Sequence, residues 1–249
     1  MFTNTTLKDK YAIRREAVFV VLAGLFIGSL AMLNILGLSR LIDLSFTFNG
    51  TKVPFMVFIG VLPYPITFLC TDFISELYGR KRANMVVWTG LLLNIWVLFI
   101  LWFGGILPEN HQVDSTAFFR IRELTFGATA ASMIAYLTAQ FVDVHLFHFL
   151  KKLTNGKHLW LRNNGSTLTS QLIDSISVVL ITYYGAKAID LHPDTHVFSF
   201  LTMLIASNYL FKMVSALLDT IPFYIGVKWL SKFLDIDPIQ EYKAEKYTS

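Results

Sequence analysis

Apolar residues occur along this chain in long runs, separated by short segments rich in Lys and Arg. Six runs have the length needed to cross a lipid bilayer, which is about 20 predominantly apolar residues. They cover residues 17–37, 54–77, 83–107, 124–150, 165–187 and 197–221. The runs are unbroken rather than striped, which is typical of helices surrounded by lipid. The pattern predicts an all-α integral membrane protein with six transmembrane helices.

Proline residues should disturb two of these helices. Pro63 and Pro65 lie in the second span, and each lacks the amide hydrogen of the helical ladder. We expect the second helix to be broken there, with the freed carbonyl groups facing protein or a polar cavity. A simple kink for packing explains the same residues. The sixth helix should kink at Pro222 and continue to residue 234.

Positive charges are distributed unequally between the loops on the two sides. Fifteen Lys and Arg residues fall in the N-terminal tail, the turn at 78–82, the loop at 151–164 and the tail at 228–249, and five fall in the opposite loops. Cytoplasmic loops carry the excess of Lys and Arg. We therefore expect both termini in the cytoplasm, with one transmembrane domain over residues 1–249.

The composition supports lipid as the solvent and excludes several functions. Of the 249 residues, 54% are hydrophobic and 15% are charged, whereas average soluble domains are about 25% charged. The loops explain the net charge of +4, so no nucleic-acid partner is predicted. No Gly-rich phosphate loop, HExxH or G-x-S-x-G motif is present, so no enzyme and no cofactor is predicted. His145 and His148 have no matching ligand cluster, so no metal site is predicted either.

Charged and amide side chains inside the predicted spans are the strongest functional signal. A charge at the bilayer centre costs roughly 2.5–3.5 kcal/mol on insertion scales, so several together require a reason. At about 1.5 Å rise per residue, they fall in a band from the midplane to the inner half of the bilayer. We expect them to share one cavity. These side chains occur as one pair on each of four spans. The pairs are Asp72 and Glu76 on the second span, Gln140 and Asp143 on the fourth, Gln171 and Asp174 on the fifth, and Asn208 and Lys212 on the sixth.

The spacing of these residues places each pair on one face of its helix. Asp72 and Glu76 are four residues apart, and Glu76 could instead pair with Arg80 at the membrane interface. Residues 137–143 and 168–174 read LTAQFVD and LTSQLID, so in each a Gln precedes an Asp by three residues. Such groups can also bridge helices through hydrogen bonds of about 0.6 kcal/mol. Two acids with two amides favour a binding site.

Lys212 is the expected counter-ion of the buried acids. It should pair with Asp174, Asp143 or Asp72. A buried pair contributes little net stability once desolvation is counted, which favours a role in binding or gating.

Four segments resemble one known family. They read PYPITFLCTDFISELYGRKRAN, AQFVDVHLFHFLKK, STLTSQLIDS and NYLFKMVSALLDTIPFY. The segments are similar to the queuosine precursor transporter family, also called the vitamin uptake transporter family. The most specific feature is T-D-x-x-x-E-x-Y-G at residues 71–79. The resemblance implies a multi-pass protein of the bacterial inner membrane that imports 7-deazaguanine precursors of the modified tRNA base queuosine, by facilitation or driven by a gradient.

The chemistry of this implied substrate suggests roles for the polar residues. Its ring N–H and exocyclic amine would suit the carboxylate of Asp143 or Asp174, and the glutamines would orient the ring. Asp72 and Lys212 would form a switchable pair. A flat heterocycle also stacks on aromatic rings, and the candidates near the polar band are Phe68, Phe73, Tyr136, Phe141 and Phe211.

Other functions remain open at the level of sequence. A substrate-binding subunit of an energy-coupling-factor vitamin importer would need an energising partner, and the small residues of segment 23–31 could dock one. A homo-oligomer is also compatible with the sequence. An intramembrane enzyme could use Asp72 with Glu76, or Asp143 with His145, as acid and base. A membrane scaffold would not need the buried acids at all.

Overall fold

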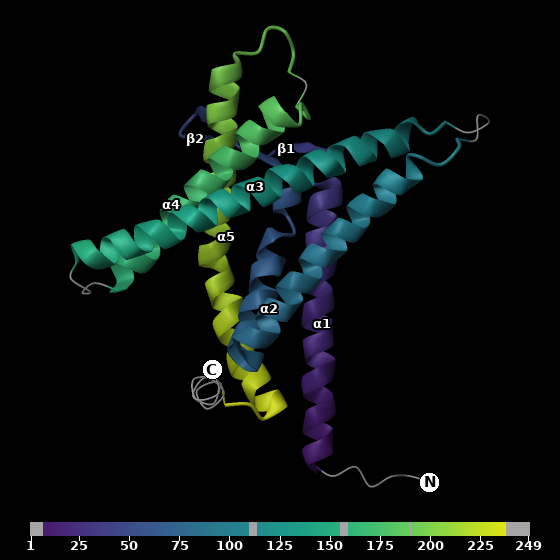
Figure 1. The fold of residues 1–249 in the computed structure, drawn as a ribbon. Coiled ribbons are helices and arrows are strands. Elements are labelled where there is room, and N and C mark those ends of the chain that lie inside the picture. Colours follow the sequence, from purple (N-terminus) through teal and green to yellow (C-terminus); the bar gives the residue numbers. More distant parts are fainter. Residues whose placement is uncertain (1–6, 110–113, 155–158, 190, 238–249) are drawn as a thin grey trace. The chain divides into compact units, whose positions relative to one another are not determined.

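The computed structural model describes residues 7–109, 114–154, 159–189 and 191–237. These residues are mostly helical (Figure 1). The helices are α1 (Leu7–Leu36), α2 (Tyr64–Gly104), α3 (Thr116–Leu153), α4 (Leu159–Leu180) and α5 (Val197–Leu234). Because Gly79 has non-helical dihedral angles inside α2, the described chain contains six long helical segments. The predicted number of helices is therefore confirmed.

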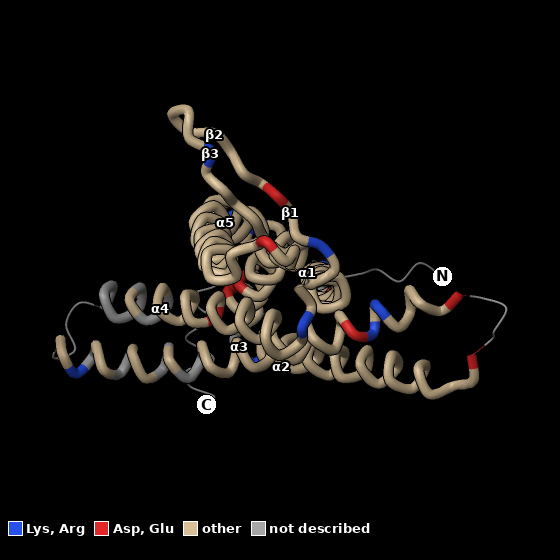
Figure 2. The backbone as a smooth tube through the Cα atoms, turned by 90° about the horizontal axis from the view of Figure 1, so that it is seen from above, with Lys and Arg blue, Asp and Glu red and all other residues tan. Residues whose placement is uncertain are grey.

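Three segments are long and apolar enough to cross a membrane within the described parts of the chain: Lys10–Leu36, Lys81–Gly104 and Val197–Leu234. They correspond to the first, third and sixth predicted spans. In Figure 2, most of the helical backbone carries no charged residue. The chain is thus a membrane protein, and further crossings by the other helical segments stay a prediction.

The predicted all-α fold is wrong for the connection between α1 and α2, which contains four short strands. They are β1 (Leu41–Asp43), β2 (Phe46–Phe48), β3 (Thr51–Val53) and β4 (Met56–Phe58). β1 pairs antiparallel with β4, and β2 pairs antiparallel with β3. Asn49 and Gly50 join β2 to β3, and both have positive φ, at 47° and 78°. Two such residues form the tight turn whose twist matches that of a hairpin.

The second predicted span, 54–77, is also wrong at its beginning. A short 3-10 turn, η1 (Ile59–Val61), follows β4, and α2 starts only at Tyr64. The prolines therefore flank the start of this helix instead of breaking it. Pro63 precedes the helix and Pro65 lies in its first turn, where the missing amide hydrogen would have had no helical partner.

The break in α2 lies later, at Gly79. Its φ of 82° and ψ of 166° are in a region that is essentially restricted to glycine. The turn predicted at residues 78–82 is thus reduced to one residue. The helical segment before it runs from Tyr64 to Tyr78, about 22 Å at the usual rise, which is less than the roughly 30 Å of the hydrocarbon core.

The last helix continues through Pro222 and ends at Leu234, as predicted for the extension of the sixth span. The proline ring removes one hydrogen bond of the helical ladder, to the carbonyl of Leu218. Whether the helix kinks there stays a prediction. Earlier in the chain, α4 is followed directly by a π-helical turn, η2 (Ile181–Gly185).

The chain forms two compact units, which are described separately. Unit 1 comprises Met1–Met32, Leu62–Val97 and Ser215–Ser249, and unit 2 comprises Leu33–Val61 and Leu98–Val214. α1, α2 and α5 contribute to both. The organisation as a single transmembrane domain stays a prediction.

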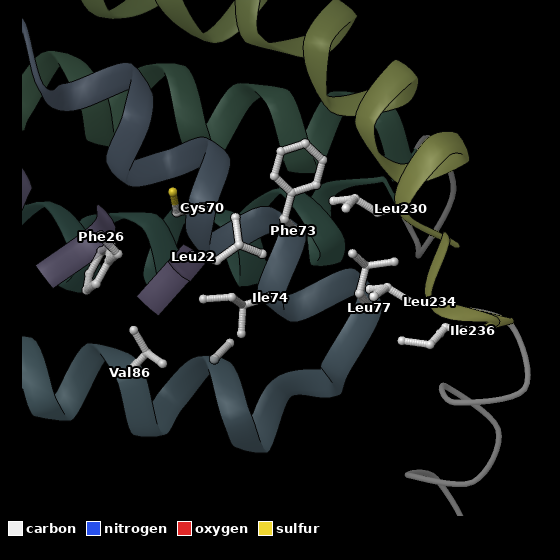
Figure 3. Close-up of a cluster of buried hydrophobic side chains, with 11 residues drawn as sticks. Leu22, Phe26, Cys70, Phe73, Ile74, Leu77, Val86, Leu230, Leu234 and Ile236 are labelled. Atoms are coloured by element: carbon white, nitrogen blue, oxygen red, sulfur yellow. The ribbon is translucent and has the colours of Figure 1, made fainter. Parts of the chain in front are cut away.

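A hydrophobic cluster holds the helices of unit 1 together (Figure 3). Phe73 of α2 packs against Phe223 of α5, with ring centroids 5.5 Å apart. A Cβ atom added to Gly226 would lie 2.3 Å from the ring of Phe73, so α5 approaches α2 closely here. The other members of the cluster include Leu22, Phe26, Ile74, Leu77, Leu230, Leu234 and Ile236.

A smaller cluster lies in unit 2, where β4 meets the helices. Phe58 packs there with Val179 of α4 and with Leu204 of α5. The amide of Met56 also donates a hydrogen bond to the hydroxyl of Ser207, at 3.2 Å. These contacts place the beginning of α5 beside β4.

Tyr78 precedes the break in α2, and its ionisation offers a test of unit 1. Burial raises its pKa from 10.0 to about 12. Because the folded state holds this proton more tightly than the unfolded state, stability should be constant up to about pH 10 and fall as the pH rises to about 12. We expect an alkaline absorbance titration to show one late-ionising tyrosine that disappears in Tyr78→Phe. Identical curves for the two proteins would contradict this prediction.

Candidate functional site

An ion pair joins two helices of unit 2 at the polar positions of the predicted spans. The ammonium of Lys212 on α5 donates a hydrogen bond to the carboxylate of Asp174 on α4. The side chains are 8% and 18% exposed, respectively. The predicted pairing of Lys212 with a buried acid is confirmed for Asp174. Since a desolvated charge is costly without a partner, each residue makes the other tolerable at this position.

Two amide side chains flank this ion pair along the helices. Gln171 lies three residues before Asp174 and Asn208 lies four residues before Lys212, so each amide shares a helix face with a charged residue. The amide group of Asn208 donates to the carbonyl of Leu204, at 2.7 Å. Asn208 is buried, and Gln171 is partly buried. We refer to Gln171, Asp174, Asn208 and Lys212 as the polar cluster.

Gln171 has an unsatisfied acceptor. Its Oε1 atom is buried and has no hydrogen-bond partner among the residues that the structure describes. A buried polar atom without a partner costs roughly 1–3 kcal/mol. The backbone carbonyl of the same residue accepts from the hydroxyl of Ser175 at 2.9 Å. Oε1 is thus available to a donor, such as an N–H group of a ligand.

The local sequence explains why α4 and α5 meet here. Tyr209 donates its hydroxyl to the carbonyl of Leu168, at 3.3 Å, and so ties α5 to α4 close to Gln171. Small side chains line the same helices, since Ser170 and Ser175 are both buried. Small residues let membrane helices approach closely enough for polar groups to pair.

The remaining predicted residues of unit 2 lie on α3 or nearby on α5. Tyr136 is exposed on α3, and Phe211 is partly buried beside Lys212 in sequence. Three predicted residues, Gln140, Phe141 and Asp143, belong to the helical backbone of α3, but their side chains lie outside the described part of the structure. Their roles stay predictions.

The other predicted residues belong to unit 1. Asp72 and Glu76 are both exposed on the first segment of α2. Phe68 is exposed, whereas Phe73 is buried in the hydrophobic cluster. A single pocket that unites these residues with the polar cluster stays a prediction.

Sequence reasoning missed several buried hydroxyl groups of unit 2. Thr125, Thr129, Thr182 and Ser207 are nearly or fully inaccessible. Ser and Thr within long apolar runs were an available signal, but such residues also satisfy their own helix backbone and therefore indicate a site only weakly. Within the described residues, no group of three His, Cys, Asp or Glu side chains could hold a metal ion.

Two grooves of unit 2 differ from the polar cluster in the residues that line them. One, of about 560 Å³, lies between the β2–β3 segment and α5 and is lined mainly by apolar residues, including Phe46, Pro54 and Phe198. A second, of about 440 Å³, lies around Asp114 and Arg120 near the start of α3. Neither is lined by a residue of the polar cluster.

Comparison with known proteins identifies the family. Residues 59–226 match the profile described as "Putative vitamin uptake transporter". The chain is 27% identical over 174 residues to a "Probable queuosine precursor transporter" of Bacillus subtilis, covering 68% of this chain and 71% of that protein. It is 22% identical over 165 residues to the "Queuosine precursor transporter" of Escherichia coli, covering 66% and 70%. No solved structure matches. The chain belongs to the vitamin uptake transporter family, whose members are membrane transporters and not enzymes.

Proposed function

We propose that this protein imports 7-deazaguanine precursors of queuosine, the 7-cyano or the 7-aminomethyl form, across the bacterial inner membrane. The observation that carries the proposal is the similarity to relatives named as queuosine precursor transporters. The same names do not favour the alternative of a substrate-binding subunit that depends on an ATP-driven partner. Transport would be facilitative or driven by a gradient, with both termini in the cytoplasm.

The polar cluster has the chemistry to recognise such a ligand. A 7-deazaguanine has two N–H donors along one edge and a carbonyl acceptor beside them. Oε1 of Gln171 is an acceptor that has no donor among the described residues, and the carboxylate of Asp174 can accept a second donor. Lys212 can donate to the ligand carbonyl. The cluster therefore offers complementary groups at a depth where water is scarce.

The Asp174–Lys212 pair is a candidate for the switchable element of the site. While the two charges are paired, the site is close to neutral and tolerable in the membrane. A ligand that replaces part of this pairing with its own hydrogen bonds can enter without leaving either charge unsatisfied. We expect Asp143 and Gln140 on α3 to complete the site.

The test of this function is precursor-dependent queuosine in tRNA. The gene would be expressed in bacteria that lack both precursor synthesis and their own importer, at limiting 7-cyano-7-deazaguanine. We expect queuosine to appear in tRNA only when the protein is present. Unchanged, queuosine-free tRNA despite protein in the membrane would overturn the proposal. The purified protein, reconstituted in liposomes without any other protein, should also accumulate the precursor. A subunit that depends on a partner would bind the precursor without accumulating it.

A further inference from the structure

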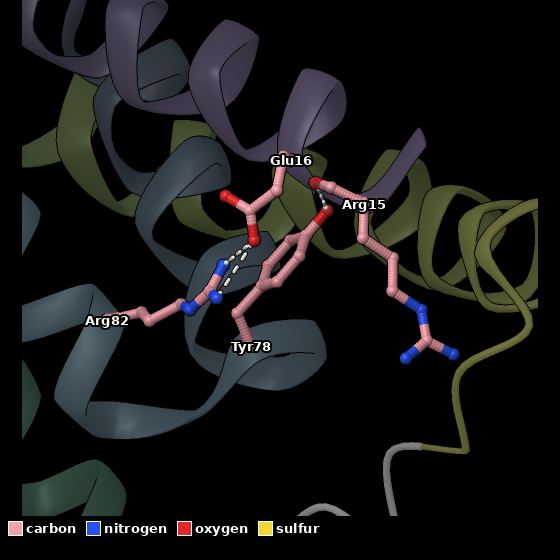
Figure 4. Close-up of polar contacts among 4 residues, drawn as sticks. All are labelled: Arg15, Glu16, Tyr78 and Arg82. Atoms are coloured by element: carbon pink, nitrogen blue, oxygen red, sulfur yellow. Dashed lines mark hydrogen bonds and ion pairs between the residues drawn. The ribbon is translucent and has the colours of Figure 1, made fainter. Parts of the chain in front are cut away.

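Three helices are joined by polar contacts in unit 1, and four of the residues involved are shown in Figure 4. The hydroxyl of Tyr78, just before the break in α2, donates to the backbone carbonyl of Arg15 on α1, at 2.9 Å. Two guanidinium nitrogens of Arg82, just after the break, donate to Oε1 of Glu16, each at 3.0 Å. The first turns of α1 are thus tied to both sides of Gly79.

The third helix joins through its C-terminal end. Nε of Arg15 donates to the carbonyl of Leu234 at 2.9 Å, and the same guanidinium donates to the carbonyl of Asp235. Carbonyl groups at the end of a helix lack intrahelical donors and carry the negative end of its dipole, so a cation is favoured there. We call this group of contacts the clasp. It consists of these two carbonyl groups and of Arg15, Glu16, Tyr78 and Arg82.

Apolar residues lie beside the clasp. Leu77, Leu234 and Ile236 are buried together in the hydrophobic cluster of unit 1 (Figure 3). In a bilayer, apolar contact between helices has little advantage over contact with lipid tails, because both are equally apolar. The polar contacts of the clasp therefore add to packing in keeping the three helices together.

The clasp is built from contacts that can break. The Arg82–Glu16 pair is solvent-exposed, with side chains 41% and 60% accessible. Exposed ion pairs contribute little free energy because water competes for both charges. The Arg82 guanidinium also lies 5.0 and 5.7 Å from the ring centroids of Phe19 and Tyr78, distances at which a cation is attracted to an aromatic ring.

We propose that the clasp is a gate, which holds α1, the break in α2 and the C-terminal end of α5 together in this conformation and opens in each transport cycle. This inference rests on the proposed import function. Transporters expose their site alternately by moving one group of helices against another, with the motion absorbed at a few backbone positions. Gly79 lies between Tyr78 and Arg82, the two clasp residues of α2. Its non-helical backbone conformation makes it a candidate for the position that absorbs this motion.

Reversible crosslinking tests the gate. In a Cys70→Ser background, which removes the single native cysteine, Glu16→Cys and Arg82→Cys would be joined by a short bis-methanethiosulfonate reagent in membranes. We expect uptake of 7-cyano-7-deazaguanine before crosslinking, loss of uptake afterwards, and recovery on reduction. The matched control is Ile13→Cys with Ala17→Cys, which joins two exposed positions of α1 outside the clasp and should leave uptake unchanged.

The outcomes separate the gate from the transport function. Full uptake by the crosslinked Glu16–Arg82 variant would overturn the gate, as would failure of the two cysteines to crosslink. Absence of uptake by the Cys70→Ser background, which keeps all residues of the clasp, would instead overturn the proposed function. In that case, spin labels at the same two cysteines still test the gate, since opening predicts two distances between them and a permanent contact predicts one.

Discussion

Replacing Lys212 with Met is expected to abolish precursor uptake and to destabilise the protein by several kcal/mol. The substitution leaves the carboxylate of Asp174, which is 18% exposed, without the ammonium that compensates for its burial. Removing one partner of a buried ion pair costs about 3–5 kcal/mol, because the other charge remains desolvated or must take up a proton. Thermal unfolding of the purified protein and queuosine in tRNA measure the two effects.

A second variant separates the fold from the function. Combining Lys212→Met with Asp174→Leu removes both charges, and replacing a buried pair with apolar residues is often neutral for stability. We expect the double variant to regain stability but not uptake. Lys232→Met, at an exposed position in the last turn of α5, is the matched control and should change neither. Normal uptake by Lys212→Met would contradict the assignment of the polar cluster as the transport site.

The sequence predicted the helices well because the length of an apolar run is a local property. The first, third and sixth spans are confirmed as helices apolar enough to cross a membrane. The errors arise where one residue type has two meanings. Pro63 and Pro65 predict a break in a helix, but proline is equally suited to the beginning of a helix. The apolar residues before them belong in part to β4, which has the same composition as the start of a membrane span.

The hairpin between α1 and α2 had a recognisable signal. Asn49-Gly50 is the strongest short-range indication of a two-residue hairpin turn, and Phe, Thr and Val surround it. Membrane-scale windows of about 20 residues average such short strands into the apolar runs beside them. A search for turns inside the predicted loops would have found this hairpin.

The candidate site was predictable only in part. Charged groups inside apolar runs are rare enough to be noticed, so the sequence limited the partner of Lys212 to three acids, of which the structure shows Asp174. The acceptor of Gln171 could not be predicted, because its lack of a partner depends on how α4 and α5 pack. The clasp could not be predicted from the sequence for another reason. Its acceptors include backbone carbonyls, such as those of Arg15 and Leu234, which every residue type possesses.

Gly79→Ala is the second substitution with a large expected effect. At φ 82° and ψ 166°, any side chain meets its own backbone, so alanine is strained there by about 1–3 kcal/mol or more. The strain is relieved if residue 79 becomes helical, which would make α2 continuous and turn Arg82 away from Glu16. We therefore expect a lower unfolding temperature together with strongly reduced uptake.

Gly24→Ala distinguishes this effect from the general consequence of changing a glycine. Gly24 lies within α1, and no atom would lie within 4 Å of a Cβ added there. Alanine is favoured over glycine inside a helix by about 1 kcal/mol, so this control should be neutral or slightly stabilising. If Gly79→Ala behaves like Gly24→Ala in both unfolding and uptake, the break in α2 is not required. If only uptake falls, the break serves motion more than stability, because the folded state tolerates a continuous helix that the transport cycle does not.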